Sequence, residues 1–205
     1  FGKPHVVSGQ TLGPQLGERD WSLVAALLNS ARVVGLRESK SYEVAGRMGV
    51  ADDVRQLTID DASLLPGAPV TAGRPYCLVT LARHIGEHDR ETFLTETAAL
   101  LDGLADRLNI VFSAHFGPLD GGASRGDELV HDEVIARMTA SSRVERIVDS
   151  AASAGLARAA SLVVSSRYHP AVFAVSGGVP ALGIAVDDYT TTKLTGALGN
   201  FGQTG

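Results

Sequence analysis

The sequence predicts an α/β protein with two doubly wound, Rossmann-like units, of which the first is truncated at its N-terminus. Short runs of valine, leucine and isoleucine alternate with amphipathic segments along almost all of the 205 residues, and one segment rich in proline and glycine interrupts the alternation. Apolar strands that are each followed by a helix indicate a parallel sheet with both faces covered. Because the chain opens at Phe1 without an initiator methionine and runs straight into a strand, we expect the first unit to lack its beginning.

The first unit is predicted to occupy residues 1–65. Its apolar start reads as a strand, and the amphipathic segment that follows places Trp21, Val24 and Leu28 on one helical face. In chain order, we predict a strand, a helix, a strand, a helix and a strand at residues 6–8, 18–30, 32–36, 39–48 and 54–59.

A linker is predicted at residues 65–75, because LPGAPVTAGRP is rich in residues that interrupt helices and strands. The alternation then restarts in a second unit, residues 76–205. Its strands are predicted at residues 76–81, 109–114, 144–147, 161–165 and 181–185. Its helices are predicted at residues 91–107, 128–139, 149–159, 170–176 and 191–198.

The composition is that of a globular protein with a packed core, with 44% hydrophobic and 20% charged residues. A net charge of −5, few aromatic residues and the lack of a lysine and arginine cluster argue against nucleic acid as a partner. No apolar run is long enough to cross a bilayer, so we expect no membrane span. The single Cys77 cannot form an internal disulfide and argues against a zinc site, which fits a reducing cytoplasm.

Ligands of parallel sheets bind at the carboxyl ends of the strands, so the strand-to-helix loops are the candidate sites. The first is SGQTLGP, in which Gly9, Gln10 and Gly13 bring backbone amides close to a helix start, a setting that suits an anion. It lacks the middle glycine and the lysine of nucleotide-binding loops, and on its own it is read as an ordinary tight turn. The second is RESKS, in which Arg37 either reaches a cleft or makes a surface salt bridge.

The third loop, SAHFGP, carries His115 at the predicted end of a strand, before a long loop of the kind that closes over ligands. A lone histidine also serves as a structural hydrogen-bonding group, and both interpretations stay open. The other histidines are read as structural or solvated: His5 starts a strand, His84 and His88 lie in a polar loop, and His131 lies on a charged helix. No group of histidines and carboxylates has metal-ligand spacing, so no metal is predicted.

The fourth loop, SSRYHP, follows the buried strand at residues 161–165 and gives the strongest signal. Pro170 fits the first helical position, where its missing N–H costs nothing. His169 then caps the helix, and Arg167 lies near its positive end, where a guanidinium and free amides suit a carboxylate or phosphate. The same field lowers the pKa of the imidazole and favours a neutral ring at pH 7. The alternative is an Arg–His pair that only braces the turn.

The segment ASLVVSSRYHPAVFAVSGGVPALGIAVDDYTTTK resembles the C-terminal signature of the polysaccharide pyruvyltransferase family. The signature is a buried strand, S-x-R-x-H, a helix of small residues, G-V-P, a second strand, an acidic residue, a tyrosine and a lysine. The matching positions are Ser165, Arg167, His169, Gly178, Val179, Pro180, Asp187, Tyr189 and Lys193.

Upstream segments resemble the same family in the same order. These are VVSGQTLGP, VVGLRESKSYEVAGRMGV and SAHFGP with the later GDE. Asp60 and Asp61 stand where the family usually has an aspartate, whereas an alanine replaces the proline that usually precedes His115.

The resemblance implies a fold like that of the two-domain GT-B glycosyltransferases, with the active site between the domains. It implies phosphoenolpyruvate as the donor, no cofactor, and as acceptor a sugar diol of a cell-surface glycan or lipid-linked sugar, which becomes a cyclic pyruvate ketal. We assign His169 as general acid or base and Arg167 as the clamp for the anionic donor. Substrate-binding roles are assigned to Gly9, Gln10, Gly13, Arg37, His115, Ser166, Tyr189 and Lys193.

Two other functions stay open. A glycosyltransferase of the same architecture would use a nucleotide sugar and would commonly place a glutamate in or just after the helix that begins at the fourth loop. No acidic residue occurs between Ser161 and Val186, which argues against that function. A non-catalytic homologue would keep the fold alone, and the presence of Arg167 and His169 argues against it.

Overall fold

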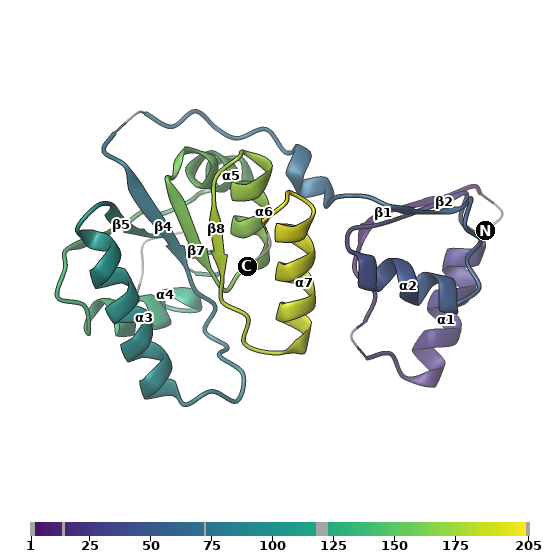
Figure 1. The fold of residues 1–205 in the computed structure, drawn as a ribbon, viewed down its shortest axis with the longest axis horizontal. Helices are drawn as coiled ribbons and strands as arrows, with labels where there is room; N and C mark the ends of the chain where they lie inside the picture. The colour runs from purple at the N-terminus through teal and green to yellow at the C-terminus, as the bar shows by residue number, and fades with distance from the viewer. Residues whose placement is uncertain (1–2, 14, 72, 118–122, 204–205) are drawn as a thin grey trace.

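The computed structural model describes residues 3–13, 15–71, 73–117 and 123–203, which form two α/β units joined by an extended segment (Figure 1). The first unit has a three-stranded parallel sheet in the order β1-β2-β3. Its elements are β1 (Val6–Gln10), α1 (Glu18–Asn29), β2 (Val33–Leu36), α2 (Ser39–Arg47) and β3 (Arg55–Leu57). The order and approximate positions of these five elements are as predicted.

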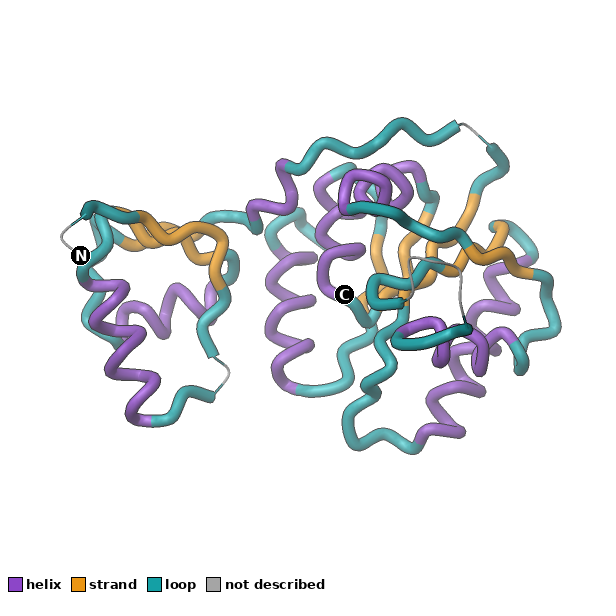
Figure 2. The backbone as a smooth tube through the Cα atoms, turned by 180° about the vertical axis from the view of Figure 1, so that it is seen from behind, coloured by secondary structure: helices purple, strands orange, loops and turns teal. Residues whose placement is uncertain are grey.

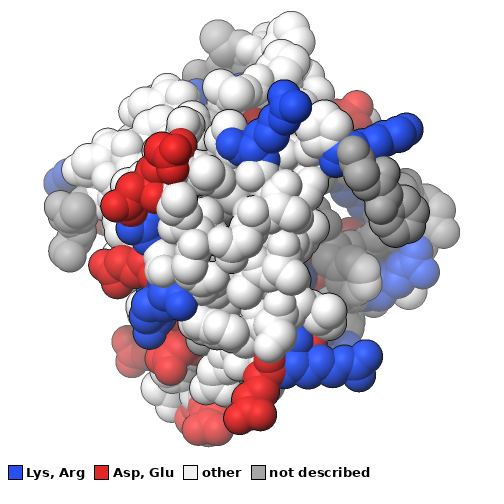
Figure 3. Space-filling model, turned by 90° about the vertical axis from the view of Figure 1, so that its right-hand side faces the viewer, with Lys and Arg blue, Asp and Glu red and all other residues white. Residues whose placement is uncertain are grey.

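Both helices of the first unit pack on the same face of its sheet (Figures 1 and 2). The core between them includes Leu28 of α1, Leu36 of β2 and Ala45 of α2, all almost completely buried. Apolar side chains also remain exposed on this unit, including Leu23 and Leu27 on α1. The face that this end of the molecule presents is largely uncharged at its centre, with charged side chains towards its rim (Figure 3).

The second unit has a five-stranded parallel sheet in the order β6-β5-β4-β7-β8. The strands are β4 (Tyr76–Thr80), β5 (Asn109–Phe112), β6 (Ser142–Val144), β7 (Leu162–Ser165) and β8 (Ala181–Gly183). The helices are α3 (Arg90–Ala105), α4 (Asp127–Ile135), α5 (Ser150–Ala159), α6 (Tyr168–Ser176) and α7 (Asp188–Gly199).

The helices of the second unit cover both faces of its sheet. Tyr76 and Leu78 of β4 belong to the core cluster that α5 and α6 build, whereas Cys77 and Val79 belong to the cluster built by α3 and α4. This alternation is the two-residue period of a strand. The chain adds β5 and β6 on one side of β4 and then β7 and β8 on the other. The loops after β4 and β7 therefore flank the switch point of the sheet, where ligands of such folds bind.

Several predicted boundaries are wrong, and helix α7 begins at Asp188 instead of residue 191. Helix α6 begins at Tyr168, with Arg167 as its N-cap, so that His169 and Pro170 are its second and third residues. Proline is tolerated there because the N–H groups of the first helical turn have no partner within the helix. Strand β6 ends at Val144 instead of residue 147, because the described ladder with β5 ends at Phe112. Helix α4 ends at Ile135 instead of residue 139.

The short 3₁₀ helix η1 (Asp61–Leu64), which the sequence did not predict, connects the first unit to the linker. Helix α7 then returns from the second unit to the first (Figure 1). Asn200, just after α7, donates from Nδ2 to the Arg37 carbonyl at 2.7 Å, and Lys40 Nζ donates to Thr192 Oγ1 at 3.1 Å. In the part of the chain that the structure describes, no helix has the length and apolar character required to cross a membrane.

Candidate active site

The turn from β7 to α6 is held by its two serines. Ser165 Oγ accepts the Arg167 N–H at 3.0 Å and lies 3.0 Å from the Thr80 carbonyl at the end of β4. Ser166 Oγ accepts the Ala82 N–H at 2.7 Å. Both serines are buried, so their hydroxyls tie the loop after β4 to the loop after β7. Ser166, which we expected to bind substrate, thus has a bracing contact, although it also borders a cavity.

Arg167 projects from this turn to Asp127, the first residue of α4. Its Nε donates to Asp127 Oδ2 at 2.9 Å, and Nη2 forms an ion pair with Oδ1. The Asp127 side chain is fully buried and also accepts the Phe116 N–H at 3.0 Å. Bidentate pairing of this kind fixes the plane of a guanidinium. Among the described residues Nη1 makes no hydrogen bond, so that edge of the guanidinium is free for a ligand.

Two cavities meet at this turn, and we name each after one lining residue. The Lys193 cavity has a volume of about 530 Å³ and is bordered by Ser166, Arg167, Tyr189 and Lys193. The Glu128 cavity has a volume of about 370 Å³ and is bordered by Leu65, Glu128, Ile147, Ser153 and Phe173. The two cavities share two of their described lining residues, His115 and His169. A pair of imidazoles thus separates them.

Both imidazoles have pKa values below the ordinary value of a histidine. Burial, with smaller contributions from nearby His169 and Arg167, lowers the pKa of His115 to about 4. Burial is also the main reason that the pKa of His169 lies below its ordinary value, although its side chain is exposed to the cavities. The predicted lowering is therefore present at His169, with burial in place of the helix field as its main cause. His115 Nε2 lies 2.8 Å from Ser153 Oγ, which orients its ring.

Tyr168 connects the two units through its ring. The guanidinium of Arg37 lies 4.2 Å from the centre of this ring, and Lys193 Nζ lies 4.8 Å from it. Lys193 also lies 4.6 Å from the Tyr189 ring. Cations over aromatic rings are held by the negative face of the ring. No carboxylate among the described residues forms an ion pair with Lys193.

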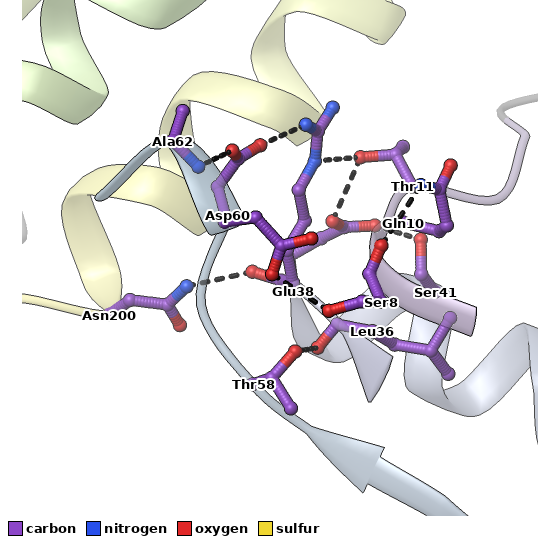
Figure 4. A network of polar contacts seen from close by, with 12 residues as sticks. Ser8, Gln10, Thr11, Leu36, Glu38, Ser41, Thr58, Asp60, Ala62 and Asn200 are labelled. Atoms are coloured by element: carbon purple, nitrogen blue, oxygen red, sulfur yellow. Dashed lines mark hydrogen bonds and ion pairs between the residues drawn. The ribbon is translucent and has the colours of Figure 1, made fainter. Parts of the chain in front are cut away.

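Arg37 itself contacts Thr11 and Asp60, which belong to a polar network at the carboxyl ends of β1 and β2 (Figure 4). It forms an ion pair with the buried Asp60, and its Nε donates to Thr11 Oγ1 at 2.6 Å. Asp60 also caps η1 by accepting the Ala62 N–H at 2.8 Å. Buried Glu38 accepts from Thr11 at 3.1 Å. Arg37 therefore supports the cleft beside Tyr168 without bordering either cavity.

The glycine-rich loop of the first unit lies apart from the two cavities. Gly9 has φ +57° and faces Asp61, and Gly13 has φ +98°, so both occupy backbone conformations that favour glycine. Gln10 is exposed and donates to the Ser8 carbonyl at 2.9 Å. None of the three borders the described cavities, and their substrate-binding role remains a prediction.

His131 lies on helix α4, as predicted, but the sequence did not indicate that its side chain is buried. This side chain is only 1% exposed, and its Nε2 accepts the Leu81 N–H at 3.0 Å. Burial lowers the pKa of His131 to about 4. Sequence reasoning also gave no role to Asp127, Glu128 or Ser153. The acidic pair at the start of α4 was a usable signal, since it follows the loop that carries His115.

Among the described residues, no group of three or more histidine, cysteine, aspartate or glutamate side chains is arranged to hold a metal ion. The candidate site consists of a cavity lined by Arg167, Lys193 and Asp187, a second cavity lined by several carboxylates, and two histidines between them.

The chain is similar in fold to solved structures in complex with UDP or with UDP-GlcNAc. The chain aligns over 96% of its length with S. aureus MnaA in complex with UDP, with 14% identity and a TM-score of 0.59, covering 59% of that chain. It aligns over 98% of its length with UDP-GlcNAc 2-epimerase from Neisseria meningitidis bound to UDP-GlcNAc, with 12% identity and a TM-score of 0.57, covering 61% of that chain. The chain thus spans about three fifths of each.

These similarities define the class of fold, which is the Rossmann-like GT-B architecture with parallel sheets. A search of curated protein sequences found no match. The family model described as "Polysaccharide pyruvyl transferase" matches residues 1–188, and the chain therefore belongs to the polysaccharide pyruvyl transferase family.

Proposed function

We propose that this chain carries the donor site of a phosphoenolpyruvate-dependent pyruvyltransferase, which forms a cyclic ketal on a sugar diol of a cell-surface polysaccharide or glycolipid. The observation that carries the proposal is the convergence of Arg167, Lys193 and two imidazoles of lowered pKa, His115 and His169, on the Lys193 cavity. Membership in the family supports the reaction class.

The charges of the Lys193 cavity suit a donor with a phosphate and a carboxylate. Its lining includes the cations Arg167 and Lys193 and one carboxylate, Asp187. The first residues of α6 lie in the same wall, and their amide groups add positive potential. The free Nη1 edge of Arg167 offers two further N–H donors in a fixed plane, because Asp127 holds the opposite edge.

The reaction balances without a cofactor. One acceptor hydroxyl bonds to C2 of phosphoenolpyruvate while C3 takes up a proton and becomes a methyl group. The C2–O bond to phosphate then breaks, inorganic phosphate leaves, and the second hydroxyl closes the ketal ring at C2. Two hydroxyl protons are released; C3 takes up one, and the other leaves with phosphate. Nothing is oxidised or reduced.

His169 is the proposed general acid and base. As a neutral imidazole it accepts the hydroxyl proton, and as an imidazolium it returns a proton to C3. His115, which borders the same two cavities, supports this transfer. We place the reaction in the cytoplasm, because Cys77 is buried as a free thiol, which suits a reducing compartment.

The alternative donor is a nucleotide sugar, which the structural similarity to nucleotide-sugar enzymes supports. Calorimetric titration of the protein with phosphoenolpyruvate and, separately, with UDP-glucose distinguishes the two. We expect heat of binding with phosphoenolpyruvate and none with UDP-glucose. Binding of UDP-glucose without binding of phosphoenolpyruvate would overturn the proposal and favour a glycosyltransferase.

A further inference from the structure

The Glu128 cavity is chemically different from the Lys193 cavity. Among its lining residues are three carboxylates, Glu128, Glu145 and Asp149, and one guanidinium, Arg146. An anion such as phosphoenolpyruvate is repelled by this arrangement. One side of the same cavity is apolar, with Leu65, Ile147 and Phe173.

Glu128 is the side chain in this cavity that most needs a ligand. It is the second residue of α4 and only 7% exposed, and its Oε2 has no hydrogen-bond partner among the described residues. Arg146 Nε lies 3.9 Å from the other oxygen, Oε1, which is beyond hydrogen-bond distance. A buried carboxylate oxygen without a donor is unfavourable. Hydroxyl groups of a bound ligand would supply the missing donors.

We propose that the Glu128 cavity binds the acceptor, a neutral sugar ring, and that Glu128 accepts hydrogen bonds from its hydroxyls. The inference rests on the proposed function. A pyranose has C–H groups for the apolar wall and hydroxyls for the carboxylate, and it carries no charge for the other acidic side chains to repel.

The position of the cavity fits this role. His115 and His169 are the described residues that border both cavities. A donor in the Lys193 cavity and an acceptor in the Glu128 cavity therefore meet at the two imidazoles. The acceptor oxygens then lie beside groups that take up their protons, as ketal formation requires. Because the donor and the acceptor lie on opposite sides of His115 and His169, both substrates bind at the same time.

Saturation-transfer NMR with three probes, the methyl glycosides of β-D-galactose, β-D-glucose and α-D-mannose, tests the inference. We expect at least one to bind the wild-type protein, and phosphoenolpyruvate to leave that binding in place. Glu128→Gln should weaken it about tenfold, because hydrogen bonds to a charged acceptor are lost. Glu128→Ala should weaken it at least as much.

The matched control is Glu133→Gln, the same change on the same helix, where Glu133 forms a partly exposed ion pair with Arg90. Its glycoside binding should equal that of the wild type. The inference would be overturned if none of the three glycosides bound the wild-type protein, or if both Glu128 variants bound the glycoside as tightly as the wild type does. Displacement of the glycoside by phosphoenolpyruvate or by uridine would also overturn it.

The design separates this inference from the proposed function. Melting temperatures report whether each Glu128 variant folds, and the wild-type competition experiments need no variant. Phosphoenolpyruvate should bind the wild type and Glu128→Gln equally, because Glu128 does not border the Lys193 cavity. If the glycosides bind and phosphoenolpyruvate does not, the donor proposal fails. If phosphoenolpyruvate binds and the glycosides do not, only the proposed acceptor site in the Glu128 cavity is refuted.

Discussion

Asp127 holds Arg167 by two contacts across 40 residues of sequence: Nε lies 2.9 Å from Oδ2, and Nη2 pairs with Oδ1. The carboxylate is fully buried, whereas about a third of the Arg167 side chain is exposed. The pair therefore anchors one edge of the guanidinium in the protein, and Arg167 also borders the Lys193 cavity.

Asp127→Asn should lower the free energy of unfolding by about 1–3 kcal/mol, because it removes the charged partner of Arg167 and leaves the Phe116 N–H with a weaker acceptor. It should also weaken phosphoenolpyruvate binding, since the guanidinium loses its fixed orientation. Urea unfolding and calorimetry measure the two effects. Asp132→Asn, at an exposed position on the same helix, is the control. Equal losses of stability and of phosphoenolpyruvate binding in both variants would show that the pair of Arg167 and Asp127 makes no specific contribution.

Stability should fall as the pH decreases from 6.5 to 4. The pKa of buried His131 is about 4 in the folded protein, against an ordinary 6.5, so the unfolded chain binds more protons in this interval. At about 1.4 kcal/mol for each pH unit, this one histidine accounts for roughly 3 kcal/mol. Urea unfolding at pH 7 and pH 5 should show a smaller pH dependence in His131→Gln than in the wild type. His88→Gln, in an exposed loop, should keep the wild-type dependence.

Gly196→Ala should push the two units apart. An added Cβ at this position of α7 would overlap the Cβ of Glu38, which is buried at the start of α2. Overpacking of this kind costs about 1–3 kcal/mol. Gly199→Ala is the matched control, because a Cβ there meets nothing within 4 Å and alanine favours the helix. Unfolding curves that coincide for the two variants would contradict the described contact.

His169→Ala should reduce turnover about 10²–10⁴-fold and leave phosphoenolpyruvate binding nearly unchanged, because its imidazole transfers protons while cations hold the donor. The measurement is phosphate release from phosphoenolpyruvate in the presence of the cell-envelope glycan fraction. His88→Ala serves as the control. Normal turnover in the His169 variant would remove the general acid and base assignment.

The order of strands and helices was predictable because strands such as β4, β5 and β7 are short buried apolar runs separated by amphipathic segments. The start of α6 was predicted two residues late, since Pro170 is compatible with any position in the first helical turn. The contact between Arg167 and Asp127 was beyond reach, because it depends on how α4 packs beside the β7–α6 turn. His131 illustrates the same limit: its charged neighbours in sequence gave no sign of burial, whereas tertiary packing buries it.

The position of Arg167 and His169 beside a cavity was predictable because polar groups at the end of a buried strand are costly without a ligand or partner. The structure brings His115, Arg167, His169, Tyr189 and Lys193 to one cavity. It leaves the glycine-rich loop outside, since Gly9 packs against Asp61 in the first unit. The spacing of residues along the sequence does not show which side chains of the two units lie at the same cavity.

The most direct test of the central claim is the thermal shift that phosphoenolpyruvate causes in the wild-type protein and in Arg167→Ala. At ten times the dissociation constant, a ligand that binds only the folded state adds about 1.4 kcal/mol, which raises the melting temperature by a few degrees. We expect this rise in the wild type and in the exposed control Arg107→Ala, and its loss in Arg167→Ala. A rise of equal size in Arg167→Ala would contradict the donor site at the β7–α6 turn.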